Sequence, residues 1–179
     1  MIQTKGFILF TLCSLIITSC KIYGQNEDGN EYIKSQLTSA AREIIDSSGT
    51  CTLITLDDEF LPMVRIMDPF PPESDFTVWF GTNSKSRKVN QIKNNPNVTL
   101  YYQDSDVSGY VVIHGTAQII DDPKEKQTRW KDGWEAFYPN NRETYLLIKV
   151  TPDWMEILSV SRGIIGDSKT WRTPVVRFD

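Results

Sequence analysis

The sequence has very little histidine and cysteine. One His and three Cys occur among 179 residues, and Cys13 lies inside an apolar leader. A structural zinc site usually takes four Cys or His ligands, so no structural metal site is expected. Cys51 is the one cysteine that follows Cys20, which excludes an internal disulfide in the folded domain. Core packing therefore has to stabilise the fold.

The sequence also lacks an excess of positive charge. Lys and Arg number 19 against 23 Asp and Glu, a formal net charge of -4. Nucleic acids and anionic membranes attract proteins through positive charge. We therefore expect no nucleic-acid partner, and a membrane contact only through a lipid anchor. Hydrophobic residues make up 40% of the chain and aromatic residues 11%, which is typical of one folded domain.

No hydrophobic run is long enough to span a bilayer as a helix. The apolar run of residues 6–17 follows Lys5, and a spanning helix needs roughly 20 apolar residues. A positively charged start followed by a short apolar run predicts a secretory signal peptide over residues 1–19.

The end of this leader resembles a bacterial lipobox. In Ile17-Thr18-Ser19-Cys20, a small residue precedes a cysteine whose thiol can carry a diacylglycerol. The sequence thus predicts lipidation of Cys20 and an exported bacterial lipoprotein anchored to a membrane, periplasmic or at the cell surface. The alternative is ordinary cleavage after Gly24, for which the large Ile22 is unfavourable.

The rest of the chain predicts a polar tether over residues 20–30 and one domain over residues 31–179. Short runs of β-forming residues alternate with turns, and short turns favour an antiparallel sheet closed into a barrel over a parallel α/β sheet. Strands are expected over residues 51–56, 61–67, 76–82, 98–102, 110–120 and 145–150, the last bounded by Pro152 with the alternative that it resumes through Ile157. Helices are expected over residues 31–46, from a cap at Asn83-Ser84 through Ile92, and from 123 onward. Residues 163–172 predict a tight loop that packs back on the barrel.

The densest group of chemically useful side chains lies where a strand ends and a helix begins. Three hydroxyls and three cations occur there: Thr82, Ser84, Ser86, Lys85, Arg87 and Lys88. Free amides at a helix start, together with such side chains, suit a phosphate group. The alternative is a solvated basic face on a short helix. Arg65, on the second strand of a hairpin, favours the anion site because a closed sheet can bring it near.

Several short motifs occur in a particular order along the domain. They are Leu53-Ile54-Thr55-Leu56, residues 62–67, Val78-Trp79-Phe80-Gly81-Thr82, Ser86-Arg87-Lys88 with Gln91-Ile92, Asn95-Pro96-Asn97-Val98 and Gly115-Thr116-Ala117. Their order and spacing resemble the FMN-binding split barrels of the pyridoxamine 5'-phosphate oxidase-like superfamily, most closely its general stress protein branch. The resemblance covers residues 31–157. It implies a mainly β fold with α-helices: a six-stranded antiparallel Greek-key split β-barrel with flanking helices.

The same resemblance implies a homodimer with one FMN at each end of the interface. Carried over by position, Arg65, Arg87 and Lys88 would hold the FMN phosphate, with Ser86 in the same motif. Ile66 and Met67 would line the flavin ring, and Thr82 would contact the flavin. Tyr110 stands where the oxidase itself has a Gln supplied by the partner subunit.

The sequence departs from the oxidase at its substrate-binding positions. Residues 128–134 do not match the helix that presents a Tyr and an Arg to the substrate phosphate, and the C-terminal Trp and Arg of the oxidase are not recovered. The resemblance therefore implies an FMN-dependent oxidoreductase of unknown substrate, not a vitamin B6 oxidase. The alternative is a non-catalytic protein that binds a flavin, a deazaflavin or haem in a stress-related role. No catalytic side chain stands out.

Overall fold

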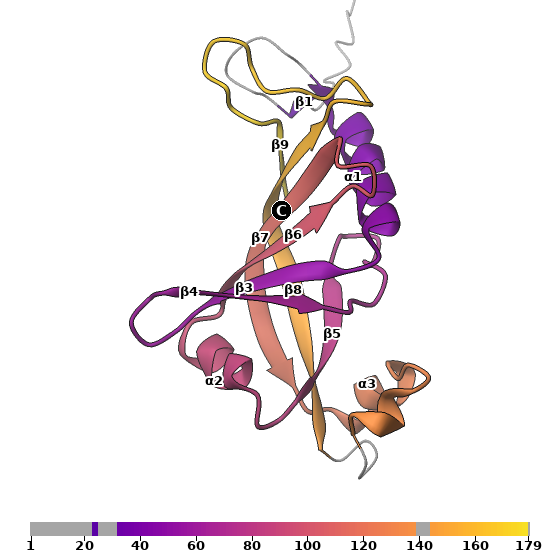
Figure 1. Cartoon of the computed structure of the whole chain (residues 1–179), viewed down its shortest axis with the longest axis vertical. Coiled ribbons are helices and arrows are strands. Elements are labelled where there is room, and N and C mark those ends of the chain that lie inside the picture. Colours follow the sequence, from indigo (N-terminus) through magenta and orange to yellow (C-terminus); the bar gives the residue numbers. More distant parts are fainter. Residues whose placement is uncertain (1–22, 25–31, 139–143, 179) are drawn as a thin grey trace, which may run out of the picture.

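The computed structural model describes residues 23–24, 32–138 and 144–178 (Figure 1). The predicted signal peptide and Cys20 lie outside the described residues. Within the predicted tether, Tyr23–Gly24 form strand β1, which pairs with β2 (Tyr32–Ile33) just before the first helix. Among the helices of the described part, none has the length and apolar character needed to cross a membrane.

An antiparallel sheet of seven strands forms the centre of the molecule, in the order β4-β3-β6-β7-β8-β5, with β9 paired to β8. Just beyond β4, Pro69 pairs with Phe80 of β5, which closes the sheet into a barrel. The strands are β3 (Cys51–Leu56), β4 (Pro62–Met67), β5 (Val78–Asn83), β6 (Asn97–Gln103), β7 (Gly109–Ile120), β8 (Tyr145–Ser159) and β9 (Val175–Arg177).

The antiparallel barrel predicted from the sequence is confirmed, but with seven strands in place of six. Strand β5 pairs with residues 145–150 of β8, and β9 pairs with residues 154–156. The second half of β8 is therefore covered by the C-terminal tail. As predicted, the preceding loop packs back on the barrel, since Ile164 pairs with Ser159.

Strand β8 runs through Pro152 without a break, so the predicted interruption there is wrong. Pro152 pairs with Gly115 at a bulge where the register between β7 and β8 shifts. The two backbones approach closely, because a Cβ on Gly115 would lie 2.3 Å from the Thr151 carbonyl oxygen. The shift leaves Asp153 outside the pairs, so the ladder is already irregular next to Pro152, which has no N–H to donate.

Three α-helices flank the barrel: α1 (Lys34–Ser48), α2 (Arg87–Asn94) and α3 (Pro123–Thr128), followed by a 3₁₀ turn, η1 (Trp134–Ala136). Helix α1 lies at the upper end in Figure 1, and α2 and α3 lie at the lower end. The apolar stripe of α1 packs into the main core through Leu37, Ala40, Ala41, Ile44 and Ile45. Helix α3 begins as predicted, with Asp122 accepting a hydrogen bond from the backbone N–H of Glu125.

The strands alternate between the barrel interior and the outer face. In β3, Cys51, Leu53 and Thr55 point inward and are at most 1% exposed. Burial raises the pKa of the Cys51 thiol to about 12, so this cysteine stays protonated and unreactive. Its role is that of a small apolar core residue.

Candidate functional site

The candidate site lies where β5 ends and α2 begins. Asn83, the last residue of β5, builds the turn between them: its side chain accepts from the Lys85 N–H at 2.9 Å, and its carbonyl accepts from the Ser86 N–H at 2.9 Å. Helix α2 therefore starts at Arg87 with Ser86 as its N-cap, later than the predicted cap at Asn83-Ser84. This turn places Ser86, Arg87 and Lys88 next to the end of β5.

The first turn of α2 is left without a side-chain cap. The Ser86 hydroxyl makes no hydrogen bond to a helix N–H, and the first turn carries no acidic residue. Instead, the Ser86 hydroxyl accepts from Lys88 Nζ at 2.8 Å. Uncapped N–H groups at a helix start carry partial positive charge, which adds to that of the side chains around them.

Lys88 is held over the end of β5. Besides Ser86, its Nζ donates to Thr82 Oγ1 at 3.3 Å, and Thr82 is 2% exposed. Burial lowers the pKa of Lys88, and the charge of Arg65 lowers it further. The ammonium group thus lies in a place where its charge is disfavoured by its surroundings.

Arg65 comes from β4, on the inward side of the strand opposite Leu53. Its guanidinium donates to Thr55 Oγ1 at 2.8 Å and to Gln91 Oε1 at 3.0 Å. Both acceptors are neutral, so they fix the orientation of the guanidinium without neutralising its charge. Burial lowers the pKa of Arg65, as does the neighbouring charge of Arg87.

Thr55 and Gln91 hold Arg65 in place through a buried hydrogen-bonded network. The Thr55 hydroxyl also donates to Gln91 Oε1 at 2.7 Å, and the two side chains are 0% and 8% exposed. Neither residue has a role predicted from the sequence, although both lie in the motifs that carry the resemblance. Thr55 could have been found as a polar residue in the inward series of β3, and Gln91 as a polar residue between the buried Val89 and Ile92.

No carboxylate balances these cations within the described ranges. The ion pairs found there are formed by Lys126, Arg129, Lys131 and Arg162, and none includes Arg65, Arg87 or Lys88. Three cations whose charges repel one another, with two hydroxyls and an uncapped helix start, form a site for a multiply charged anion. We refer to Arg65, Arg87 and Lys88 as the cation cluster.

A separate aromatic cluster packs on the outer face of β5, opposite the side that faces the main core. A Cβ on Gly81 would lie 2.3 Å from the Trp134 ring, so only glycine allows that ring to pack over the strand next to Thr82. The cluster joins β5 and the first part of β8 to the segment that follows α3, and consists of Trp79, Trp134, Tyr138, Tyr145 and Leu147, with Phe70, Ile120 and Trp130 packed against it.

The structure does not bring every predicted site residue to the cation cluster. Thr82 and Ser86 lie there, together with the three cations. Met67 turns inward and packs against the main core, whereas Ile66 points to the outer face and is 75% exposed. Tyr110 stacks on Tyr101, with ring centroids 5.9 Å apart, at the opposite end of β7 from α2.

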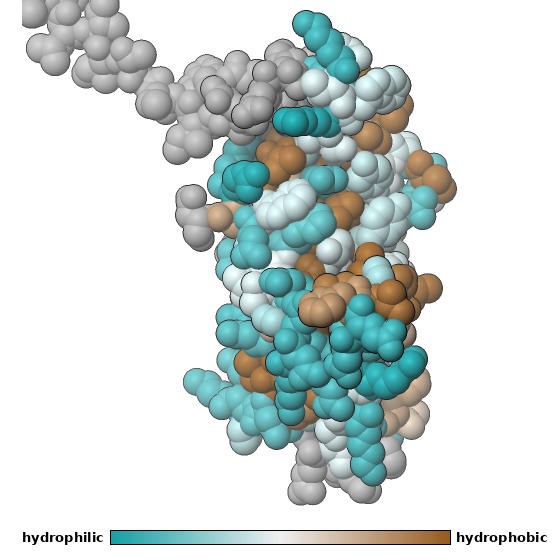
Figure 2. Space-filling model, turned by 90° about the vertical axis from the view of Figure 1, so that its left-hand side faces the viewer, coloured by the Kyte–Doolittle hydropathy of each residue, from teal (hydrophilic) through white to brown (hydrophobic). Residues whose placement is uncertain are grey.

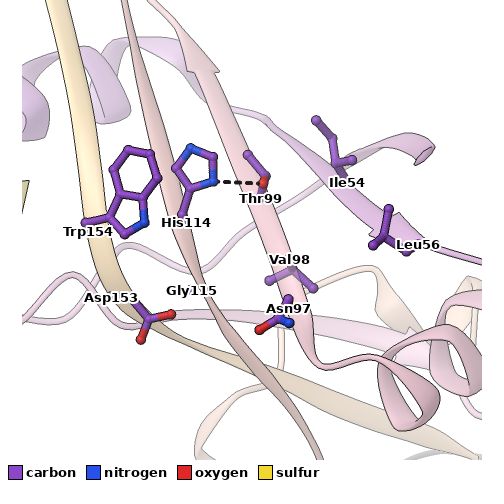
Figure 3. Close-up of a pocket in the computed structure, with 9 residues that line it drawn as sticks. All are labelled: Ile54, Leu56, Asn97, Val98, Thr99, His114, Gly115, Asp153 and Trp154. Carbon is purple, nitrogen blue, oxygen red and sulfur yellow. Dashed lines mark hydrogen bonds between the residues drawn. The ribbon is translucent and has the colours of Figure 1, made fainter. Parts of the chain in front are cut away.

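The outer face of the sheet carries a shallow pocket of about 310 Å³ (Figure 3). In it, the rings of His114 and Trp154 stack at 3.9 Å, and His114 Nδ1 is hydrogen-bonded to Thr99 at 3.2 Å. Burial lowers the pKa of His114, an effect that the charge of Glu156 opposes. Figure 3 shows Ile54 and Leu56 of β3 on the other side of the pocket and Asn97 and Asp153 at one end of it, so the lining is mixed polar and apolar.

The sequence and the fold both match known proteins. Residues 36–163 match the family model described as "Pyridoxamine 5'-phosphate oxidase like". No curated protein matches the sequence.

Three solved structures share the fold over most of their length. A Clostridium acetobutylicum protein related to general stress protein 26 is 22% identical with a TM-score of 0.65, covering 82% of this chain and 96% of its own. General stress protein 26 from Bacillus anthracis is 27% identical with a TM-score of 0.57, covering 69% and 92%. A pyridoxamine 5'-phosphate oxidase-related, FMN-binding protein from Nostoc punctiforme is 13% identical with a TM-score of 0.56, covering 82% and 96%.

The family model covers well over half of the chain, and the sheet has the architecture of the split barrel in these structures. The chain therefore belongs to the pyridoxamine 5'-phosphate oxidase-like family.

Proposed function

We propose that this protein binds FMN, with the phosphate held by the cation cluster. The observation that carries the proposal is the convergence of Arg65, Arg87 and Lys88 without a balancing carboxylate in the described part of the chain. A phosphate dianion satisfies such a site, because charge-assisted hydrogen bonds are stronger than neutral ones. The Nostoc relative, which is described as FMN-binding, supports the same choice of ligand.

The proposed activity is that of a flavin-dependent oxidoreductase whose substrate is not vitamin B6. A bound flavin supplies hydride or electron transfer, while the protein orients it and tunes its surroundings. Arg129 lies in the segment where the oxidase would grip a substrate phosphate. Here it forms ion pairs with Glu73 and Glu125 and lies 3.8 Å from the Trp79 ring centroid. The positive charge of Arg129 is thus already balanced by carboxylates of the protein itself.

The phosphate role is tested by comparing FMN with riboflavin, which has the same ring without the phosphate. Replacing Arg87 with Ala should weaken FMN about 10- to 100-fold, since a hydrogen bond to a charged group contributes about 1.5–3 kcal/mol and 1.4 kcal/mol is tenfold. Riboflavin should bind the wild type far more weakly and should be insensitive to this change. Fluorescence titration measures both affinities.

Lys93→Ala is the matched control for this titration, because Lys93 is an exposed cation in the last turn of the same helix. Equal binding of FMN and riboflavin, or equal weakening of both by Arg87→Ala, would show that the cluster is a solvated basic face and not a phosphate site.

Oxidation of a reduced nicotinamide or a quinol by the flavin-loaded protein would support the oxidoreductase. Bound flavin without turnover would favour a binding protein, and preferential binding of a deazaflavin or haem would replace FMN as ligand.

We further propose that the protein is a homodimer joined through the outer face of the sheet. On β4, Val64 and Ile66 are 64% and 75% exposed, and Phe60 and Leu61 are exposed in the adjoining turn. Figure 2, which faces this side of the molecule, shows a brown patch beside a hydrophilic region. Monomeric proteins rarely expose large contiguous apolar surfaces, and a self-complementary two-fold interface is the usual way to cover one.

Ile66→Glu tests the homodimer. Because the Ile66 side chain is exposed in the single chain, the substitution should leave the fold intact, but it would place two carboxylates in the interface. We expect light scattering at micromolar concentration to report a dimer for the wild type and a monomer for Ile66→Glu. Phe137→Glu changes another exposed hydrophobic residue, the C-cap of η1, and should remain dimeric. A monomeric wild type would contradict the proposal.

Finally, we propose that the chain is exported and anchored by a lipid on Cys20, on the strength of the lipobox-like sequence before it. The prediction is that wild type sediments with membranes of a bacterial host and Cys20→Ala does not, because removal of the leader leaves the lipid as the one strong attachment. Unchanged fractionation of Cys20→Ala would refute the anchor.

A further inference from the structure

Gln91 is a buried polar side chain on the side of α2 that faces the barrel. The helix packs against β3 (Figure 1), and the neighbours of Gln91 on this side are the buried Val89 and Ile92. Gln91 itself is 8% exposed. A buried amide group costs free energy unless it is hydrogen-bonded, so the partners of this side chain indicate its role.

Gln91 forms a hydrogen-bonded triangle with Thr55 and Arg65 in which every donor can be assigned. A guanidinium group can only donate, so Thr55 Oγ1 accepts from Arg65 at 2.8 Å and Gln91 Oε1 accepts from it at 3.0 Å. The hydroxyl hydrogen of Thr55 then goes to Gln91 Oε1, 2.7 Å away. Because both neighbours require an oxygen from Gln91, the orientation of its amide group is fixed.

The amide nitrogen of Gln91 remains an unused donor. It makes no hydrogen bond within the described ranges, where the Tyr102 hydroxyl is the one fully buried side-chain nitrogen or oxygen that lacks a partner. The nitrogen of Gln91 is therefore accessible from outside the core. It is bonded to the same carbon as the oxygen that accepts from Arg65, so this donor lies beside the guanidinium. An accessible N–H group next to a cation suits an oxygen of a bound anion.

The amide at position 91 also decides the charge of the site. Glutamate has nearly the same shape and would accept the same two hydrogen bonds, but its carboxylate would form an ion pair with Arg65. The cation cluster would then carry one positive charge fewer, and the accessible N–H donor would be lost. The neutral side chain thus gives Arg65 its orientation and leaves its charge for a ligand.

We propose that Gln91 is the specificity-determining residue through which the site selects a flavin that carries a phosphate over one that does not. It is a positioning residue: its oxygen orients Arg65 without neutralising it, and its N–H group adds a neutral donor beside that charge. The inference rests on the proposed phosphate role of the cation cluster. It adds that the choice between charged and uncharged ligands depends on a side chain that carries no charge itself.

Gln91→Glu tests the proposal by titration of the purified protein with FMN and with riboflavin. We expect FMN to bind about 10- to 100-fold more weakly, as for the loss of one charge-assisted hydrogen bond, and riboflavin to bind as it does to the wild type. A substitution that only disturbed the packing of α2 would weaken both ligands alike. Gln127→Glu adds the same charge at an exposed position of α3 and should leave both affinities unchanged.

Gln91→Met separates the effect of the charge from that of the hydrogen bonds. Methionine removes the acceptor and the donor without adding a charge, so it should weaken FMN less than Gln91→Glu does. Equal or greater weakening by Gln91→Met would overturn the proposal, as would an unchanged ratio of FMN to riboflavin affinity in Gln91→Glu. Failure of Gln91→Glu to fold would also overturn it, because a carboxylate paired with Arg65 should be tolerated in this cluster.

Inorganic phosphate separates this inference from the flavin assignment. Phosphate in place of chloride at equal ionic strength should raise the unfolding temperature of the flavin-free wild type and of Gln127→Glu by the same amount, and that of Gln91→Glu by less. This result would support the role of Gln91 even if the wild type bound no FMN, and an equal rise in all three proteins would overturn it. If the wild type prefers FMN to riboflavin and Gln91→Glu keeps that preference, the inference fails while the proposed function stands.

Discussion

The site depends on positive charge that the described protein does not neutralise. Arg65 is fixed by Thr55 and Gln91, which are neutral, while Lys88 is fixed by the hydroxyls of Thr82 and Ser86. Burial lowers the pKa of both side chains, and the charge of a neighbouring cation lowers each pKa further. The free protein thus keeps these charges together against their mutual repulsion, and a bound dianion would remove that repulsion. Pre-arranged donors of this kind also reduce the cost of ordering side chains on binding.

Successive side chains of each strand point to opposite faces of the sheet, so the two faces have different roles. Inward residues of β3, β6, β7 and β8 form one core. Because β4 pairs with β3, the inward Arg65 of β4 lies close to the polar Thr55 of β3 and reaches the site. Outward residues of the same strands form a mixed polar and apolar face, on which the rings of His114 and Trp154 stack. A shift of one residue in the register of β4 would exchange Arg65 with Ile66, which would remove a cation from the site and an apolar side chain from the outer face.

Much of this arrangement could be predicted from the sequence, and the exceptions have physical causes. The meeting of Arg65 with Arg87 and Lys88 follows from strand order, which the motif spacing indicated. Thr55 and Gln91 are recognisable as polar residues at buried positions of the pattern, but their contact with Arg65 depends on which buried side chains face each other, and periodicity does not report this. The continuity of β8 through Pro152 was missed because the bulge opposite Gly115 arises from pairing with β7. Strand β9 was missed because three residues carry too little periodicity to predict a strand.

The charge of the cluster is tested most directly by the free energy of unfolding of the flavin-free protein in inorganic phosphate and in chloride at equal ionic strength. A ligand that binds only the folded state adds about 2.7 kcal/mol at a hundredfold excess over its dissociation constant. Phosphate also stabilises proteins generally by exclusion from their surface, so Arg87→Ala and Lys93→Ala are compared with the wild type. We expect an equal gain from phosphate in wild type and Lys93→Ala and a clearly smaller gain in Arg87→Ala. The same gain in all three proteins would contradict it.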